Sequence, residues 1–162
     1  IIAVSSDCGL RPIEVGRAKV DWFDLEEQLM IVPREEATKN KENWECVLTD
    51  KTANAVENWL KERNSYEKYQ GTDAMWLTKY GNPYGSGSLN RFLNTLIEDA
   101  GIKTRNRKLS WYSFRHGAAT LWVEKEGIGF AADQLRHLTV ETTKEYTNNS
   151  SLASHRRPQS VL

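Results

Sequence analysis

Long apolar runs, cysteine clusters and an excess of charge of either sign are all missing from this 162-residue sequence. No apolar stretch approaches the roughly 20 residues that a membrane-spanning helix needs, and no signal-peptide pattern opens the chain. Only two cysteines occur, Cys8 and Cys46, which are too few for a disulfide framework and lack the spacing of metal ligands. We therefore expect an intracellular, cytoplasmic protein with two reduced thiols and no bound metal.

Glycine-rich phosphate loops, internal repeats and low-complexity segments are also lacking, so the sequence gives no sign of a nucleotide or other cofactor. What is present indicates a folded domain, because 39% of the residues are hydrophobic and 10% are aromatic, with six tryptophans. A chain of this length is expected to form one domain that buries roughly two thirds of its unfolded surface.

The net charge is zero, with 22 basic and 22 acidic residues, which argues mildly against a nucleic-acid partner. The distribution of the charges argues the other way. Acidic pairs such as Glu26-Glu27 fall in predicted turns, whereas four cations crowd into one six-residue stretch before a helix: Lys103, Arg105, Arg107 and Lys108. This distribution is compatible with a single basic face.

Apolar periodicity predicts a mainly α-helical α+β domain with one small three-stranded antiparallel sheet. Gly9 is expected just after a helix that opens the chain, and Asp50 and Ser88 are the expected N-caps of two further helices. The expected strands cover 20–23, 29–32 and 44–48, and the later helices cover 12–15, 52–63, 88–100, the stretch from 111 to a break at 127–129, a short segment ending at 137, and 139–146.

The helix that begins near Trp111 carries a polar cluster beside its apolar stripe. The residues expected to face the core are Phe114, Ala118, Leu121 and Trp122. Arg115 lies about 100° around the helix from Phe114, on the face of Tyr112 and Ala119. A guanidinium and a phenol without an acidic neighbour in that stretch are suited to an anion.

Five separated pieces then follow one another in order: Gly9-Leu10-Arg11-Pro12-Ile13-Glu14, Lys39, Tyr112-Ser113-Phe114-Arg115, Leu135-Arg136-His137, and Tyr146, nine residues after His137. In these pieces the sequence resembles the tyrosine recombinases, or phage-type integrases. That family carries a Gly-Leu-Arg-x-x-Glu start, a lysine on a β-hairpin, a His-x-x-Arg helix, a Leu-Gly-His-like turn and a tyrosine nine residues after its histidine. The resemblance implies a catalytic domain over 1–148 that lacks the family's N-terminal core-binding domain, and a tail over 149–162.

The resemblance also implies site-specific cleavage and rejoining of duplex DNA, with Tyr146 as the nucleophile of a 3′-phosphotyrosyl intermediate. A free phenol is a poor nucleophile at neutral pH because its pKa is about 10, so the phosphate must be held by cations. Arg11 and Arg115 suit that role because a planar guanidinium binds phosphate oxygens bidentately. Lys39 is the implied general acid, and Lys41 competes with it because the loop length leaves the register open.

Two positions leave their roles open. His137 is implied to donate a hydrogen bond to a non-bridging oxygen, although a histidine there also suits a helix C-terminus. Tyr112 stands where the family most often has histidine; a phenol donates to phosphate but does not shuttle protons near pH 7, and similar replacements occur in archaeal-type members. Glu14 is expected to orient a catalytic side chain, and His116 to be a structural neighbour.

The implied partner is double-stranded DNA, bound by a homotetramer, with a monomer as the expected state of the free protein, and with no cofactor and no membrane. Lys41 and the basic stretch 103–108 are the expected backbone contacts. A type IB topoisomerase, which shares the catalytic set but acts as a monomer, is the nearest alternative. A catalytically silent DNA-binding or regulatory protein of the same fold and a tryptophan-rich helical interaction module are the alternatives from other classes.

Overall fold

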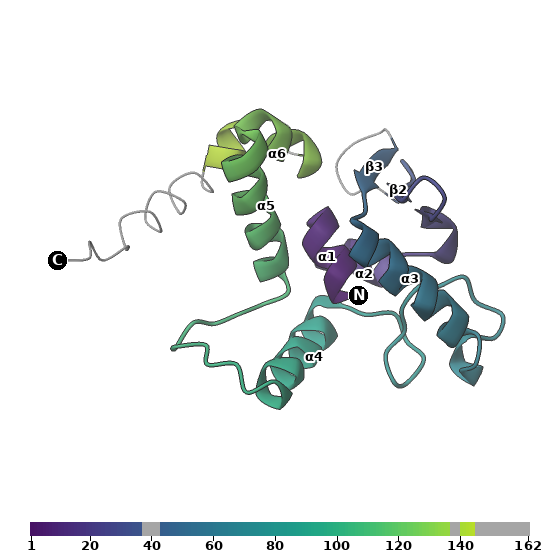
Figure 1. The fold of residues 1–162 in the computed structure, drawn as a ribbon. Coiled ribbons are helices and arrows are strands. Elements are labelled where there is room, and N and C mark those ends of the chain that lie inside the picture. Colours follow the sequence, from purple (N-terminus) through teal and green to yellow (C-terminus); the bar gives the residue numbers. More distant parts are fainter. Residues whose placement is uncertain (37–42, 137–139, 145–162) are drawn as a thin grey trace.

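A computed structural model describes residues 1–36, 43–136 and 140–144 of the chain. Helices predominate, and three short strands form one antiparallel sheet, which confirms the predicted fold class (Figure 1). Within the described ranges, no helix is both long and apolar enough to cross a membrane. The helices are α1 (Ile2–Cys8), α2 (Pro12–Arg17), α3 (Asp50–Arg63), α4 (Ser86–Asp99), α5 (Tyr112–Glu126) and α6 (Ile128–Gln134). The strands are β1 (Phe23–Asp24), β2 (Leu29–Val32) and β3 (Trp44–Val47), and 3-10 turns cover Val20–Trp22 (η1), Glu67–Tyr69 (η2) and Val140–Thr143 (η3).

The sheet has the strand order β1-β2-β3, and its last pair, Val32 with Trp44, lies at the root of the β2–β3 hairpin. Side chains of β3 alternate between buried and exposed, as predicted for a strand with one face on the core. The strand predicted over 20–23 is wrong for most of its length. Val20–Trp22 turns as a 3-10 helix that still buries Trp22, so apolar content there reflects burial and not extension.

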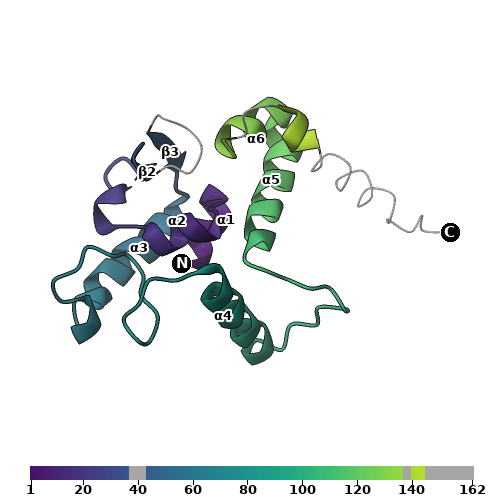
Figure 2. The same ribbon diagram turned by 180° about the vertical axis from the view of Figure 1, so that it is seen from behind.

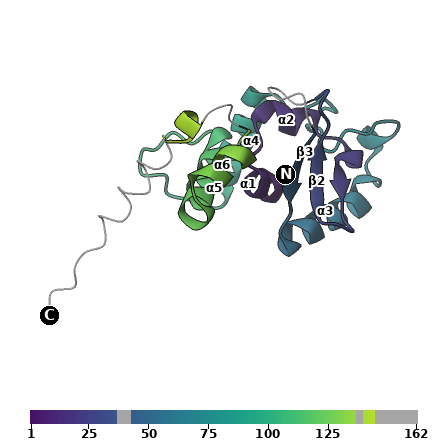
Figure 3. The same cartoon turned by 90° about the horizontal axis from the view of Figure 1, so that it is seen from above.

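Helix α1 lies between the two halves of the fold. On one side it contacts α5, and on the other it contacts α3 and β3. Figures 1 and 3 show this arrangement, with α5 and α6 on one side of α1 and the sheet on the other. The view from behind shows α4 and the loop that follows it at the end of the molecule away from the sheet (Figure 2).

Buried aromatic residues fasten α5 to this core. Trp111, directly before α5, is fully buried, and its indole Nε1 donates to Ser5 Oγ of α1 at 3.1 Å. Its ring packs against Phe114 of α5, with centroids 4.9 Å apart, and against Phe92 of α4 at 6.1 Å. Because large buried aromatics contribute much of the apolar burial in a small domain, Trp111 fixes where α5 starts.

Two predicted helix caps are wrong by a few residues. Thr49, not Asp50, precedes α3, and its hydroxyl accepts from the Thr52 N–H at 3.3 Å. Gly85 precedes α4, and the Ser88 hydroxyl accepts from the Gly85 N–H at 2.9 Å from inside the helix. Both hydroxyls accept from a backbone N–H at a helix N-terminus. The sequence therefore predicted capping at both helices, but not the residue at which each helix begins.

The apolar stripe predicted for α5 is confirmed only in part. Ala118 is buried and Phe114 packs on the core, but Leu121 is 47% exposed. The helix ends at Gly127, whose φ of 91° favours glycine, and α6 folds back against α5. That reversal places Leu135, directly after α6, against Ala119, Trp122 and Val123 of α5.

Candidate active site

Arg11 is held at the start of α2 by the local sequence. Gly9 ends α1 in the left-handed region, with φ 54°, and Pro12 occupies the first turn of α2, where a missing N–H costs nothing. The Arg11 N–H donates to Glu14 Oε2 at 2.8 Å, so the helix start and the acidic residue one turn later close on each other. This turn directs the Arg11 guanidinium toward the end of α6, where it donates to the carbonyl of Leu135 at 3.3 Å.

Arg115 reaches the same place from α5. Its side chain is buried, and its Nη1 and Nη2 donate to the Gly9 carbonyl at 2.7 Å and to the Leu135 carbonyl at 2.5 Å. Main-chain carbonyls carry no net charge, so both contacts orient the guanidinium without cancelling its positive charge. These two contacts hold the buried guanidinium beside the Leu135 carbonyl.

Leu135 O is the point at which the two arginines meet. Both Arg11 and Arg115 donate to this oxygen, although they come from distant parts of the sequence. Two like charges this close repel each other, and an anion placed between them relieves the repulsion. The arrangement is suited to an anion such as a phosphate, and that role of the two arginines stays a prediction.

Glu14 is fully buried and bridges two arginines. Its Oε1 lies 3.2 Å from Arg11 Nη1, and its Oε2 accepts from Arg136 Nη2 at 2.7 Å. Burial alone would raise the pKa of Glu14, but the hydrogen bonds and charges of Arg136 and Arg11 outweigh it and lower the pKa below its usual value of 4.5. Glu14 is thus a carboxylate, and the cluster of three guanidiniums and one carboxylate carries a net positive charge.

Arg136 is a member of this cluster that the sequence did not predict. It is buried, and its Cζ lies 4.1 Å from the ring centroid of Trp44, the first residue of β3. It occupies the position of glycine in the Leu-Gly-His-like turn, and its φ of 53° shows the left-handed conformation that glycine favours there. The sequence did contain a sign of this role, because an arginine stands where the family's turn has glycine.

Tyr112 and His116 lie on the exposed side of α5. Tyr112 is the first residue of the helix and is 46% exposed, whereas Arg115 and Ala119, predicted to share its face, are buried. The three residues share one face of α5 as predicted, but neighbouring elements cover the later turns of that face and not the helix start. A contact between its phenol and a phosphate stays a prediction.

Four predicted site residues lie outside the described residues: Lys39, Lys41, His137 and Tyr146. The described residues on either side locate the points from which they depart. The hairpin that carries both lysines leaves the sheet at Val32 and returns at Trp44, and His137 directly follows Arg136. Arg136 is a member of the arginine cluster, which consists of Arg11, Arg115, Arg136 and Glu14, and Trp44 contacts Arg136.

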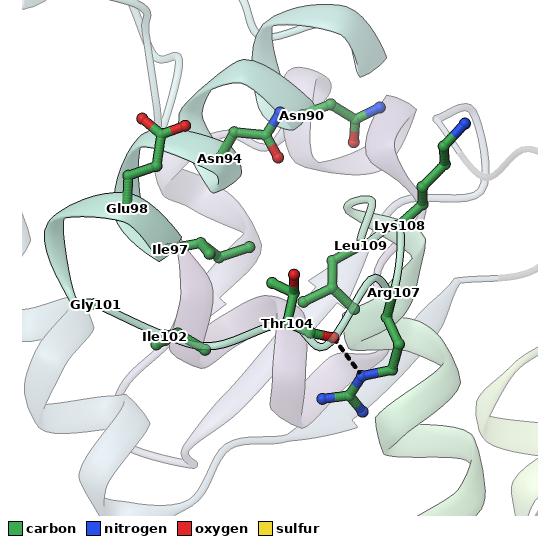
Figure 4. A pocket seen from close by; sticks show the side chains of 10 residues that line it. All are labelled: Asn90, Asn94, Ile97, Glu98, Gly101, Ile102, Thr104, Arg107, Lys108 and Leu109. Atoms are coloured by element: carbon green, nitrogen blue, oxygen red, sulfur yellow. Dashed lines mark hydrogen bonds between the residues drawn. The ribbon is translucent and has the colours of Figure 1, made fainter.

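The basic loop (residues 103–108) borders an open groove beside α4. The groove encloses about 670 Å³ and is lined from α4 by Asn90, Asn94, Ile97 and Glu98, and from the loop side by Gly101, Ile102, Thr104, Arg107, Lys108 and Leu109 (Figure 4). All four cations of the loop are exposed. Arg107 Nε donates to the Thr104 carbonyl at 3.1 Å, which turns the side chain back across the loop. The loop lies on the opposite side of α5 from the sheet (Figures 1 and 3).

Within the described ranges, no three histidine, cysteine, aspartate or glutamate side chains come together as metal ligands do. Cys8 and Cys46 are both buried, and burial raises the pKa of the Cys8 thiol well above its usual range, with the neighbouring Cys46 adding to the shift. A thiol in such surroundings is poorly reactive.

The lowered pKa of Glu14 predicts how stability depends on pH. Because the folded state binds this proton more weakly than the unfolded state, the contribution of Glu14 is complete above pH 4.5 and disappears as pH falls through the folded-state pKa. We expect Glu14→Gln to lower the unfolding free energy by about 3 kcal/mol at pH 7 and by less at acidic pH. Urea unfolding at both pH values measures the difference, and Glu57→Gln, which removes an exposed partner of Lys61, is the control. Parallel pH curves for the natural protein and Glu14→Gln would contradict the assignment.

Comparison with solved structures confirms the fold. The chain is similar to XerA recombinase, with 22% identity and a TM-score of 0.76 over 97% of this chain and 56% of that one. It is also similar to the Tn1549 transposon integrase in complex with transposon right-end DNA (16% identity, TM-score 0.74, 97% and 57% covered). The third is XerH site-specific recombinase bound to a difH substrate in a post-cleavage complex (20% identity, TM-score 0.72, 94% and 42% covered). The chain thus spans roughly half the length of these structures.

A comparison with curated proteins finds no match. A sequence model of the phage integrase family, in contrast, matches residues 1–152 and so includes every piece of the five-part pattern. None of these comparisons distinguishes the archaeal-type members from the rest of the family. The likeness to archaeal-type members, which was based on Tyr112, therefore stays a prediction. By its sequence match, and in agreement with its fold, this chain belongs to the phage integrase family.

Proposed function

We propose that this chain is the catalytic domain of a site-specific DNA recombinase that cuts and rejoins duplex DNA through a 3′-phosphotyrosyl intermediate. The observation that carries the proposal is the convergence of Arg11 and Arg115 on the Leu135 carbonyl, next to a buried cluster with net positive charge. That cluster is of the kind needed to hold a phosphate whose negative charge grows during the reaction. The DNA complexes of the Tn1549 integrase and XerH support the choice of substrate.

In the proposed reaction, the Tyr146 hydroxyl releases its proton to the surrounding water, its oxygen attacks phosphorus, and the bond between phosphorus and the 5′-oxygen breaks. Lys39, with Lys41 as the competing residue, gives a proton to the departing 5′-oxygen. His137 and Tyr112 donate hydrogen bonds to the non-bridging oxygens that Arg11 and Arg115 neutralise. Attack by a 5′-hydroxyl on the phosphotyrosine reverses these steps, so rejoining needs no nucleotide and no metal.

Four such protomers would act on two duplexes, and the free protein would be a monomer. Sequence choice would come from base contacts, from the deformability of the site and from regions outside this chain. The domain assignment, with catalysis in 1–148 and a tail over 149–162, belongs to the same proposal.

The test of this proposal is covalent capture. A pool of nicked duplexes with randomised sequence is incubated with the protein, and DNA that stays attached after denaturation is sequenced. Recombinase chemistry predicts an attached fraction enriched in one site. DNA that binds but never becomes attached would favour the catalytically silent DNA-binding protein.

The basic loop is expected to contact phosphates of the DNA backbone. Replacing Arg107 and Lys108 with alanine should make the plot of log affinity against log salt shallower by about 0.9 for each phosphate that the variant no longer neutralises. Lys51 and Lys61 belong to α3, a helix on the opposite side of α1 from α5 (Figure 1), and provide a matched double replacement that should leave the slope unchanged. Filter binding at several salt concentrations measures both slopes. Equal slopes for the two double variants would contradict this role of the basic loop.

A further inference from the structure

Arg136 has a conformational cost that glycine at the same position avoids. Its φ of 53° lies in the left-handed region, where the Cβ of an ordinary residue crowds its own backbone. A residue in this conformation persists only if its surroundings compensate for the strain. The contacts of the Arg136 side chain therefore indicate why arginine stands here.

Two contacts define the position of the Arg136 guanidinium. Its Nη2 donates to Glu14 Oε2 at 2.7 Å, and its Cζ lies over the indole of Trp44. Nε and Nη1 are buried and have no hydrogen-bond partner within the part of the chain that the structure describes. The group is thus fixed by one ion pair and one aromatic face, close to the arginines but engaged with Glu14.

The ion pair changes the electrostatics of Arg11. Glu14 contacts Arg11 through both the main-chain N–H and the guanidinium, and a lone buried carboxylate in that position would offset the charge of Arg11. Arg136 supplies a second cation to the same carboxylate. Glu14 is shared between the two guanidiniums, so Arg11, Glu14 and Arg136 together keep one net positive charge, whereas Arg11 and Glu14 alone would have none.

We infer that Arg136 is a positioning residue, which offsets the charge of Glu14 so that the group containing Arg11 keeps a net positive charge toward the phosphate at which the strand is cut. Trp44 holds the guanidinium over Glu14, and Arg136 itself does not touch the DNA. This inference rests on the proposed recombinase function. The alternative is a purely structural staple between the end of α6 and β3, which would affect folding but not the charge felt by the phosphate.

The test compares two substrates that differ in charge. One carries an ordinary phosphate at the cleavage position, and the other carries a methylphosphonate, in which a methyl group replaces one charged oxygen. Single-turnover rates of covalent attachment at saturating DNA remove differences in binding. The variants are Arg136→Met and Arg136→Lys, with Arg63→Met as the matched control. Arg63 is equally buried, lies over the ring of Tyr69 and donates to the carbonyls of Thr72 and Ala74, far from Glu14 in sequence and in contacts.

We expect Arg136→Met to slow cleavage of the phosphate about 30-fold and cleavage of the methylphosphonate less than about 3-fold, because electrostatic stabilisation scales with the charge it acts on. Arg136→Lys, which keeps the charge beside Glu14, should stay within about 3-fold on both substrates. Arg63→Met should change both rates by the same factor. Adding Glu14→Gln to Arg136→Met should restore about 10-fold of the phosphate rate, because it removes the charge that Arg136 offsets.

Equal slowing of both substrates by Arg136→Met would overturn the inference in favour of the structural staple. Unchanged rates, or no recovery on adding Glu14→Gln, would overturn it as well. In each of these cases the natural protein still cleaves the ordinary substrate, so the proposed function stands. If the natural protein cleaves neither substrate, the proposed function fails, and the inference fails with it.

Discussion

Tyr146→Phe is expected to abolish covalent attachment to DNA completely while leaving DNA binding nearly unchanged. The replacement removes one oxygen, which is the atom proposed to form the bond with phosphorus, and keeps the aromatic ring. No neighbouring group can replace the atom that forms the bond with phosphorus. The loss of covalent attachment should therefore exceed the loss caused by removing any one hydrogen-bond donor. Denaturing gels that separate free protein from attached protein measure the first quantity, and gel shifts measure the second.

Tyr80→Phe is the matched control for this loss. Tyr80 lies 77% exposed in a turn before α4, far along the chain from the arginine cluster. Its replacement should leave attachment intact. Attachment that survives in Tyr146→Phe would assign the nucleophile to another residue, and Tyr112, exposed at the start of α5, is then the first to replace.

Arg115→Lys is expected to slow covalent attachment about 10³-fold, the second largest effect. Lysine keeps the positive charge, but its single ammonium cannot span the Gly9 and Leu135 carbonyls in the fixed plane of a guanidinium. The same change weakens the donation to both buried carbonyls, although Leu135 O still accepts from Arg11, and should lower the unfolding free energy by about 2 kcal/mol. Single-turnover rates and urea unfolding, measured on the same preparation, separate the two effects.

Arg63→Lys separates stability from catalysis in this comparison. Arg63 also donates to main-chain carbonyls, at Thr72 and Ala74, and should lose similar stability when replaced. Its attachment rate should stay within about 3-fold of the natural protein, because it is no part of the arginine cluster. If Arg115→Lys and Arg63→Lys lose similar stability and attach to DNA at similar rates, Arg115 contributes only to the stability of the fold.

The pairing of Arg11 with Arg115 illustrates what could be predicted from the sequence. Each arginine stands in a short motif whose local geometry is set by nearby residues, such as Gly9 and Pro12 around Arg11. The order of the motifs then allowed a resemblance to a family, and the structure brings both side chains to one carbonyl. Their proposed roles in catalysis stay predictions.

Arg136 illustrates what could not be predicted from the sequence. Its importance depends on Trp44, on Glu14 and on a left-handed backbone, which involve three distant segments of the chain. The spacing of residues within one segment cannot predict contacts between distant segments. The same reason explains the error at Leu121, because helical spacing identifies one face but not how far neighbouring elements cover it.

The strand predicted over 20–23 failed for a different physical reason. Val20, Trp22 and Phe23 are typical of strands, yet Val20–Trp22 turns as a 3-10 helix and its Trp22 is still buried. Burial drives both outcomes, and in a segment this short it does not decide between them. The two helix caps also differ from the prediction, because Thr49 and Gly85 stand one and three residues before the expected Asp50 and Ser88. Sequence patterns locate a helix end only to within a few residues.

The most direct test of strand cleavage through a 3′-phosphotyrosine is to identify which DNA end carries the protein. A nicked duplex of a captured site, labelled separately at each end, is incubated with the protein and resolved under denaturing conditions. The proposed chemistry predicts protein attached to the fragment that ends in a 3′-phosphate, and a second fragment whose free 5′-hydroxyl a kinase phosphorylates without prior treatment. Protein attached to a 5′ end, or a cut strand with a 5′-phosphate and no attached protein, would contradict it.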